Sequence, residues 1–334
     1  MIEKGKAIKV QKRQRKLFTN NSHYDHDYKK LEWSHVPFEH PATFDTLAMD
    51  PDKKQELIQD LLVFSKSKEY YLKVGKPWKR GYLLYGPPGT GKSTLISAMA
   101  NLLDYDVYDL ELTAVKNNTK LRKLLIETTS KSIIVIEDID CSLNLSGKRR
   151  NKEGEATEED KGKAEIKREE KEESKVTLSG LLNFIDGLWS ACGGERLIVF
   201  TTNYVDELDP ALIRRGRMDM HIELSYCTFQ AFRLLAMNYL GMEDHALFDD
   251  IKELMQKHDI TPADVAENLM PKTLSEKDDN HEACLRNLIQ ALKKCKQKAK
   301  EHEKGDADEM EGMGSHQDDK GENLSARKQI NYKL

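Results

Sequence analysis

The chain has 334 residues, enough for roughly two domains, and 33% of them are charged while 38% are hydrophobic. With 53 basic and 57 acidic residues its net charge is −4, which argues against a dedicated nucleic-acid-binding protein, because such domains are basic. No apolar run is long enough to span a membrane, no secretory signal is visible, and the 5 cysteines form no Cys-x-x-Cys pair. We therefore expect an intracellular protein that is soluble as this chain stands.

The first 40 residues start with a basic stretch and contain too few apolar side chains for a complete domain. Trp33, Val36 and Phe38 follow with polar residues between them, a pattern typical of a single strand or of the end of a domain. We expect residues 1–40 to be the remnant of an N-terminal domain.

From residue 41 onward, extended and helical patterns alternate, which is typical of a parallel α/β sheet. Asp50 followed by Pro51 predicts a helix start, because Asp caps a helix and Pro suits its first position. Short apolar runs predict five strands, at 82–85, 107–112, 132–136, 197–201 and 220–224. Helical spacing predicts further helices at 95–103, around 121–125 and at 178–188. These elements predict an α/β core over residues 41–226.

Three later segments depart from this pattern. Residues 147–175 hold ten basic and ten acidic side chains, too polar to offset the entropy of ordering, so we expect a disordered insert or, alternatively, a transient helix. Residues 227–270 have the apolar spacing of a small all-helical domain. Residues 271–334 are polar and expected to be largely disordered, apart from one helix around 285–292.

The strongest local signal is the sequence from Gly86 to Ser93, which matches G-x-x-x-x-G-K-[ST] between a predicted strand and a predicted helix. Its glycines let backbone N–H groups surround phosphate oxygens, and the helix N-terminus adds partial positive charge. Lys92 is expected to reach the β- and γ-phosphates of ATP, and the Ser93 hydroxyl to bind Mg²⁺. The predicted nucleotide contacts are Gly86, Pro87, Pro88, Gly89, Thr90, Gly91, Lys92, Ser93 and Thr94.

Two acidic residues, Glu137 and Asp138, follow the apolar run of the third predicted strand. Carboxylates at this place can hold the metal through water and orient or deprotonate the attacking water. The pattern predicts that the two residues share these tasks, and it leaves open which of them is the general base.

Further polar residues follow the fourth predicted strand. Asn203 is either a hydrogen-bonding partner of the γ-phosphate or the attacking water, or the first residue of a turn. Arg214 and Arg217 either interact with the carboxyl end of a helix or act on the nucleotide of an adjacent subunit.

Taken together, Gly86–Ser93, Ile133–Asp140, Asn203 and Leu208–Asp219 resemble the AAA ATPase family over about residues 41–270. Three segments are more narrowly similar to the membrane-anchored chaperones that insert the Rieske iron–sulfur protein into respiratory complex III, and to their plant relatives. These segments are Phe38–Met49, Leu181–Gly187 and Arg214–Asp219.

The resemblance implies a five-stranded parallel P-loop core, a helical lid and a homo-oligomeric ring of six or seven subunits. It implies ATP and Mg²⁺ as cofactors, with Ser93 and Glu137 at the metal and Asp138 as the water-activating acid. It implies that Asn203 senses the γ-phosphate and that Arg214 and Arg217 are arginine fingers. It also implies a membrane in mitochondria or the endoplasmic reticulum, reached through an N-terminal anchor absent from this chain.

At two places the sequence departs from the family pattern, which limits the roles that can be inferred from the resemblance. The common order of the acidic pair is Asp then Glu, whereas Glu137 precedes Asp138 here, so the base assignment stays open. The loop at 115–119 has no aromatic residue of the kind that threading unfoldases use, which favours remodelling or translocation of a folded client.

The expected function is therefore Mg²⁺-dependent ATP hydrolysis coupled to work on an unidentified protein client. The main alternative is a nucleic-acid motor or clamp-loader-like ATPase on the same fold, which the charge balance disfavours. A monomeric small-molecule kinase and an ATP-gated scaffold with little turnover are further alternatives.

Overall fold

The computed structural model describes residues 14–20, 32–142, 176–187, 194–271 and 281–294. The charged insert expected at 147–175 and the tail beyond 294 therefore lie outside the described residues.

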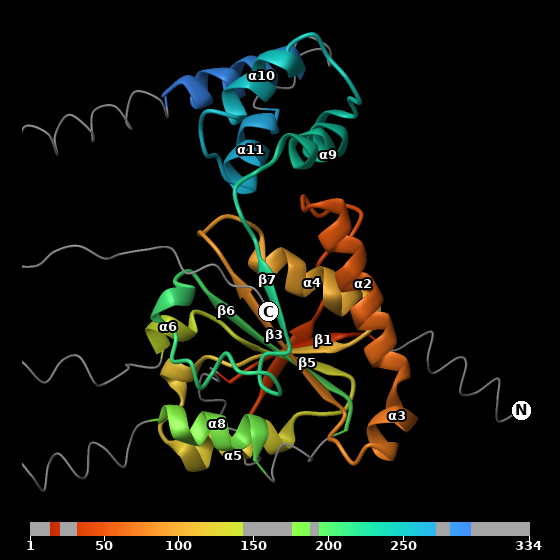
Figure 1. The fold of residues 1–334 in the computed structure, drawn as a ribbon, viewed down its shortest axis with the longest axis vertical. Coiled ribbons are helices and arrows are strands. Elements are labelled where there is room, and N and C mark those ends of the chain that lie inside the picture. Colours follow the sequence, from red (N-terminus) through yellow and green to blue (C-terminus); the bar gives the residue numbers. More distant parts are fainter. Residues whose placement is uncertain (1–13, 21–31, 143–175, 188–193, 272–280, 295–334) are drawn as a thin grey trace, which may run out of the picture.

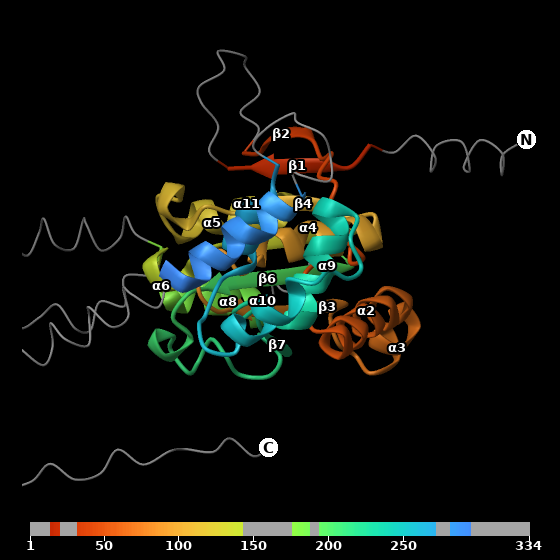
Figure 2. The ribbon, with the colours of Figure 1, turned by 90° about the horizontal axis from the view of Figure 1, so that it is seen from above.

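A seven-stranded sheet forms the centre of the molecule, in the order β2-β1-β4-β5-β6-β3-β7 (Figures 1 and 2). All neighbouring strands are parallel except β1 and β2, which pair antiparallel. The strands are β1 (Lys16–Thr19), β2 (Ser34–Pro37), β3 (Lys79–Tyr85), β4 (Asp106–Asp109), β5 (Ser132–Ile136), β6 (Arg196–Thr202) and β7 (Met220–Glu223).

The five predicted strands correspond to β3–β7, so the expected α/β P-loop core is confirmed, but the sheet has two strands more than predicted. The extra strands, β1 and β2, have four residues each, and every residue in them is partly or fully exposed. Strand β2 lies in the segment around Val36 for which the sequence indicated either a strand or the end of a domain. Because β1 pairs with β4, the boundary predicted at residue 41 does not separate these strands from the core. The second predicted strand is shorter than expected, since a 3₁₀ turn replaces its end at Leu112–Ala114.

Helices cover both faces of the sheet (Figure 1). Alternate side chains of β3 point to opposite faces: Tyr82 and Leu84 pack with α2 and α4, and Leu83 packs in the core that contains α5 and α8. The helices of this part are α2 (Pro51–Lys66), α3 (Lys68–Lys73), α4 (Lys92–Leu103), α5 (Asn118–Glu127), α6 (Ile139–Ser142) and α8 (Leu178–Asp186).

The helix start predicted at Asp50 and Pro51 is confirmed. The Asp50 carboxylate accepts hydrogen bonds from the backbone N–H groups of Asp52 at 3.0 Å and Lys53 at 3.1 Å, two donors that no helical carbonyl can reach. This cap fixes the start of α2, which packs beside α4, the helix that follows the glycine-rich loop.

A separate helical lid follows β7 and lies beyond the end of the sheet (Figure 1). It contains α9 (Phe229–Leu240), α10 (Phe248–Met255), α11 (Pro262–Leu269) and a helix over 281–294. The last helix contributes Leu285, Leu288 and Leu292, all fully buried, to the lid core. The lid therefore extends beyond the predicted boundary at residue 270, because the polar segment after Pro271 leads into one more amphipathic helix.

Truncating Leu288 tests this extended lid. Leu288→Ala leaves a cavity in a fully buried position and should lower the free energy of unfolding by about 2–4 kcal/mol. Denaturant unfolding measures the loss, and the exposed Lys293→Ala on the same helix is the matched control. Equal stability of the two variants would mean that this helix does not belong to the lid core.

Candidate nucleotide-binding site

The glycine-rich loop runs from the end of β3 into α4 with a backbone that requires glycine. Gly86 has a φ of 137°, and a Cβ there would lie 1.9 Å from the carbonyl oxygen of Leu224. Gly91 caps α4 with a φ of 96°, in the left-handed region. The loop therefore places the N-terminus of α4, with its partial positive charge, against the cavity beside it.

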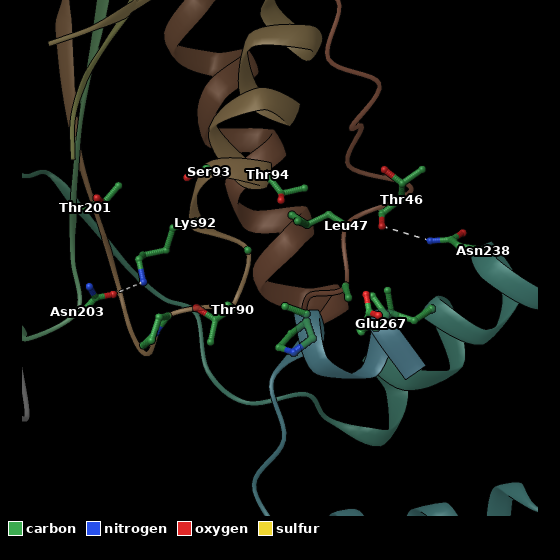
Figure 3. Close-up of a pocket in the computed structure, with 18 of the residues that line it drawn as sticks. Thr46, Leu47, Thr90, Lys92, Ser93, Thr94, Thr201, Asn203, Asn238 and Glu267 are labelled. Atoms are coloured by element: carbon green, nitrogen blue, oxygen red, sulfur yellow. Dashed lines mark hydrogen bonds between the residues drawn. The ribbon is translucent and has the colours of Figure 1, made fainter. Parts of the chain in front are cut away.

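Lys92 ties this loop to the neighbouring strand. Its ammonium donates to the carbonyl oxygens of Gly86 at 2.7 Å and Pro87 at 3.1 Å, and to Oδ1 of Asn203 at 2.7 Å (Figure 3). Burial lowers the pKa of Lys92, and the nearby carboxylates, first that of Asp138, oppose this change. Lys92 and Asn203, predicted from separate motifs, thus meet in one hydrogen bond at the carboxyl ends of β3 and β6.

Ser93 and Glu137 meet in the same way. Ser93 Oγ, in the first turn of α4, donates to Oε1 of Glu137, just after β5, at 3.1 Å. A hydroxyl and a carboxylate are the hard oxygen ligands that suit Mg²⁺, which commonly takes one or two protein ligands beside substrate phosphates and water. Within the described ranges no group of three or more His, Cys, Asp or Glu side chains could hold a metal by itself. The pair fits a magnesium ion held jointly with a phosphate.

Asp138 adopts an unusual backbone conformation, with a φ of 44°. Such a left-handed conformation costs about 1–2 kcal/mol for a residue with a side chain, so the surroundings must hold it. The Asp138 N–H donates to Thr201 Oγ1 at 3.1 Å, and the Asp138 carboxylate accepts a long hydrogen bond of 3.5 Å from Nδ2 of Asn203. Asp138 lines the cavity together with residues of the glycine-rich loop.

Asp109, at the end of β4, is a further carboxylate near this site that sequence analysis missed. Burial first, and then the negative charges of Glu137 and Glu111, raise its pKa to about 6. No local motif marks it, since it ends an ordinary strand, and only the parallel pairing of β4 with β5 brings it near Glu137.

A cavity of about 750 Å³ extends from Lys92 to the lid. Seven of the nine predicted nucleotide contacts line it, whereas Gly86 and Pro87 face Lys92 through their carbonyl oxygens instead. The far end is formed by the chain before α2 and by lid helices α9 and α11; Figure 3 shows Leu47, Asn238 and Glu267 there. This volume suits an organic ligand such as a nucleotide, whose phosphates would lie at Lys92.

Among the described residues, two hydrogen bonds join the lid to the core around this cavity. Asn238 Nδ2 on α9 donates to the carbonyl oxygen of Thr46 at 3.2 Å, and the N–H of Ala263 in α11 donates to the carbonyl oxygen of Gly89 at 3.1 Å. The residues at this end of the cavity could not be predicted from the sequence, because they come from three distant segments and share no local pattern.

The structure does not bring Arg214 and Arg217 to the cavity of their own chain. Arg214 forms an ion pair with Asp186 at the end of α8, and Arg217 Nε lies 3.6 Å from the same carboxylate. The loop that carries them is fixed to β3, since the N–H of Gly81 donates to Asp219 at 3.0 Å. The Arg214 side chain is exposed, whereas that of Arg217 is largely buried and donates to the carbonyl oxygen of Ala211; neither residue lines the cavity that contains Lys92.

Comparison with known proteins agrees with this architecture. Residues 82–226 match the ATPase family associated with various cellular activities (AAA), and residues 227–305 match the At3g28540-like AAA+ ATPase lid domain. The chain belongs to the AAA ATPase family, whose members use ATP and Mg²⁺ in general.

Its relatives include three proteins of Arabidopsis thaliana. The chain is 61% identical to AAA-ATPase At3g28580 over 90% of this chain and 61% of that protein. It is 62% identical to AAA-ATPase At3g28540, over 90% of this chain and 60% of the relative. It is also 62% identical to AAA-ATPase ASD, mitochondrial, over 88% of this chain and 59% of the relative. The chain thus spans about three fifths of the length of these relatives. No helix in the described ranges is long and apolar enough to cross a membrane.

The pKa of Asp109 generates a test of the site's electrostatics. Because its folded pKa of about 6 lies above the ordinary value of 3.8, the ionised carboxylate is unfavourable in the folded state, and stability falls as pH rises through this window. Asp109→Asn should be more stable than the parent chain above pH 6, by about 1–2 kcal/mol given its partial exposure, and the difference should shrink toward pH 4.

Denaturant unfolding at several pH values measures this difference, with the exposed Asp244→Asn as the control. A constant difference across the pH range would contradict the assigned burial of the Asp109 charge.

Proposed function

We propose that this protein hydrolyses ATP to ADP and phosphate in an Mg²⁺-dependent reaction at the cavity beneath the lid. The observation that carries the proposal is the convergence of Lys92, Asn203, Ser93 and Glu137 at the carboxyl ends of three neighbouring strands. A phosphate chain would replace the carbonyl and amide oxygens that now surround the Lys92 ammonium. The nucleoside would extend toward the lid, along the cavity.

The acidic pair then divides the chemistry. Glu137 would hold the metal together with Ser93, with which it already shares a hydrogen bond. Bound Mg²⁺ supplies positive charge that offsets the negative charge developing on the phosphates. Asp138 would accept a proton from the attacking water, because its carboxylate faces the cavity and is not the partner of Ser93.

Asn203 would act as the sensor of the γ-phosphate. Its amide now bridges the Lys92 ammonium at 2.7 Å and the Asp138 carboxylate at 3.5 Å, the two groups between which the γ-phosphate and the attacking water must fit. A terminal phosphate would separate Asn203 from Lys92, so the amide would report whether that phosphate is present.

Arg214 and Arg217 would complete the site of a neighbouring subunit in a homo-oligomeric ring of six or seven subunits. They do not line the cavity of their own chain. The ion pair with Asp186 and the hydrogen bond from the Gly81 N–H to Asp219 fix the loop that carries them. A guanidinium group supplied in trans stabilises charge in the transition state of phosphoryl transfer.

The energy of hydrolysis would be used to remodel or translocate a protein client. The 115–119 loop has no aromatic side chain to grip an extended polypeptide, which favours a client moved in a folded state. The similarity to the Rieske-protein chaperones, and a relative named as mitochondrial, make mitochondria the first compartment to examine.

Two substitutions separate binding from hydrolysis. Lys92→Ala should abolish measurable ATP binding, because it removes the cation of the phosphate site. Asp138→Asn should bind ATP normally but hydrolyse it about 10²–10⁴-fold more slowly, because the amide cannot accept the proton. Calorimetric titration and phosphate release measure the two steps.

The exposed Glu127→Gln on α5 is the control and should behave like the parent chain. Normal turnover by Asp138→Asn would assign the base to Glu137 or another group. Full ATP binding by Lys92→Ala would refute the site itself.

The arginines allow a mixing test. Lys92→Ala and Arg217→Ala should each lose about 10³-fold or more in turnover when assayed alone. Mixing them should restore part of the activity, since some interfaces then pair an intact cavity with an intact arginine. The exposed Arg233→Ala should keep full activity alone. Failure of the mixture to regain any activity would show that Arg217 does not act between subunits.

A further inference from the structure

We propose that Thr201 is a positioning residue for hydrolysis: its hydroxyl holds the backbone of Asp138 in the left-handed conformation that directs the carboxylate into the cavity. This inference rests on the proposed function, in which Asp138 accepts the proton of the attacking water. It adds a residue that does not itself receive the proton and does not need to touch the nucleotide.

The conformation of Asp138 is the first observation. In the described residues three non-glycine residues have positive φ: Asp104, Lys131 and Asp138. Asp104 ends helix α4, and Lys131 lies in the turn before β5, both places where the chain simply reverses. Asp138 instead lies between the last residue of β5 and the first residue of α6, inside the site. Such strain persists only where neighbouring groups enforce it.

The partner of the Asp138 N–H is the second observation. It donates to Thr201 Oγ1 at 3.1 Å, from a strand-to-helix turn to the side chain of the adjacent strand β6. The register places Phe200 opposite Ile136, so Thr201 lies one residue beyond the end of β5, level with the turn. Thr201 is only 2% exposed. Without its hydroxyl, the Asp138 N–H would lose this acceptor, and the turn could relax toward a negative φ.

The position of Thr201 in the cavity is the third observation. It lines the same cavity as Lys92 and Asn203, and Figure 3 shows it at the strand end near both. The next residue, Thr202, has a comparable bond, since it donates to Oδ1 of Asp140 at 2.6 Å, but it does not line the cavity. Two consecutive threonines of β6 thus bind the chain between β5 and α6. Of their two partners, Asp138 and Asp140, only Asp138 lines the cavity.

A hydroxyl that positions a carboxylate should affect turnover and not binding. The Lys92 ammonium is held by oxygen atoms of Gly86, Pro87 and Asn203, none of which lies in the turn after β5, so ATP affinity should survive the loss of the Thr201 hydroxyl. Without the Thr201 hydroxyl, the Asp138 carboxylate would be displaced from its position beside the attacking water. Such misplacement of a reacting group lowers the rate strongly. Serine keeps the oxygen and should restore the rate, whereas valine keeps only the shape.

The test compares Thr201→Val, Thr201→Ser and the parent chain in ATP binding and steady-state phosphate release. Thr201→Val should lower kcat by about tenfold or more while the Kd for ATP stays within about threefold, and Thr201→Ser should stay within about threefold in both. Thr128→Val is the matched control: it removes another buried threonine hydroxyl, one that donates to the Leu125 carbonyl outside the cavity, and should leave kcat unchanged.

A double-mutant cycle adds a readout that a purely structural role would not produce. If Thr201 acts through Asp138, Thr201→Val should cause little further loss in the Asp138→Asn background. Equal effects in both backgrounds, a parental kcat for Thr201→Val, or an equally slow Thr201→Ser would each overturn the proposal. Should Thr201→Val fail to fold, Thr201→Ala takes its place, with the same expectations.

Failure of the inference can be told apart from failure of the proposed function. If Asp138→Asn is slow and Thr201→Val is not, only the positioning role is wrong. If the parent chain binds no ATP, or Asp138→Asn turns over at the parental rate, the assignment of Asp138 itself is wrong.

Discussion

The hydrogen bonds of the Lys92 ammonium are the interaction on which the site depends. One charged group joins the carbonyl oxygens of the glycine-rich loop to the amide of Asn203, and thereby links the end of β3 to the end of β6. Partial burial makes this charge costly unless it is surrounded by oxygen atoms. The protein supplies those oxygens in this structure, and a triphosphate supplies more strongly negative ones. The charge of Lys92 thus holds the glycine-rich loop in place and would also attract the phosphates.

The parallel sheet explains why the remaining groups gather around this lysine. Parallel strands end at the same edge, so the residues that follow β3, β5 and β6 meet there although they are far apart in the chain. The lid, reached through β7, closes the other side through the bonds of Asn238 to Thr46 and of Ala263 to Gly89. One of these bonds ends on the glycine-rich loop itself, so the loop is directly connected to α11.

Much of the site could be predicted from sequence, because its chemistry is encoded in short local motifs. The glycine-rich loop, the acidic pair after an apolar strand and Asn203 are each recognisable alone, and the fold brings them together. Features that depend on tertiary contacts could not be predicted. The four residues of β1 do not show that it pairs with β4, the helix expected around 285–292 is separated by a polar segment from the lid into which it packs, and Thr201 is a typical strand residue until its bond to Asp138 is seen.

A structure of the chain with Mg²⁺ and a non-hydrolysable ATP analogue tests the central claim most directly. We expect Lys92 Nζ within hydrogen-bond distance of the β- and γ-phosphates, Asn203 released from Lys92 and facing the γ-phosphate, and the metal held by Ser93 and Glu137. Binding of the analogue elsewhere, or binding in the cavity while Lys92 keeps its bond to Asn203, would contradict this expectation.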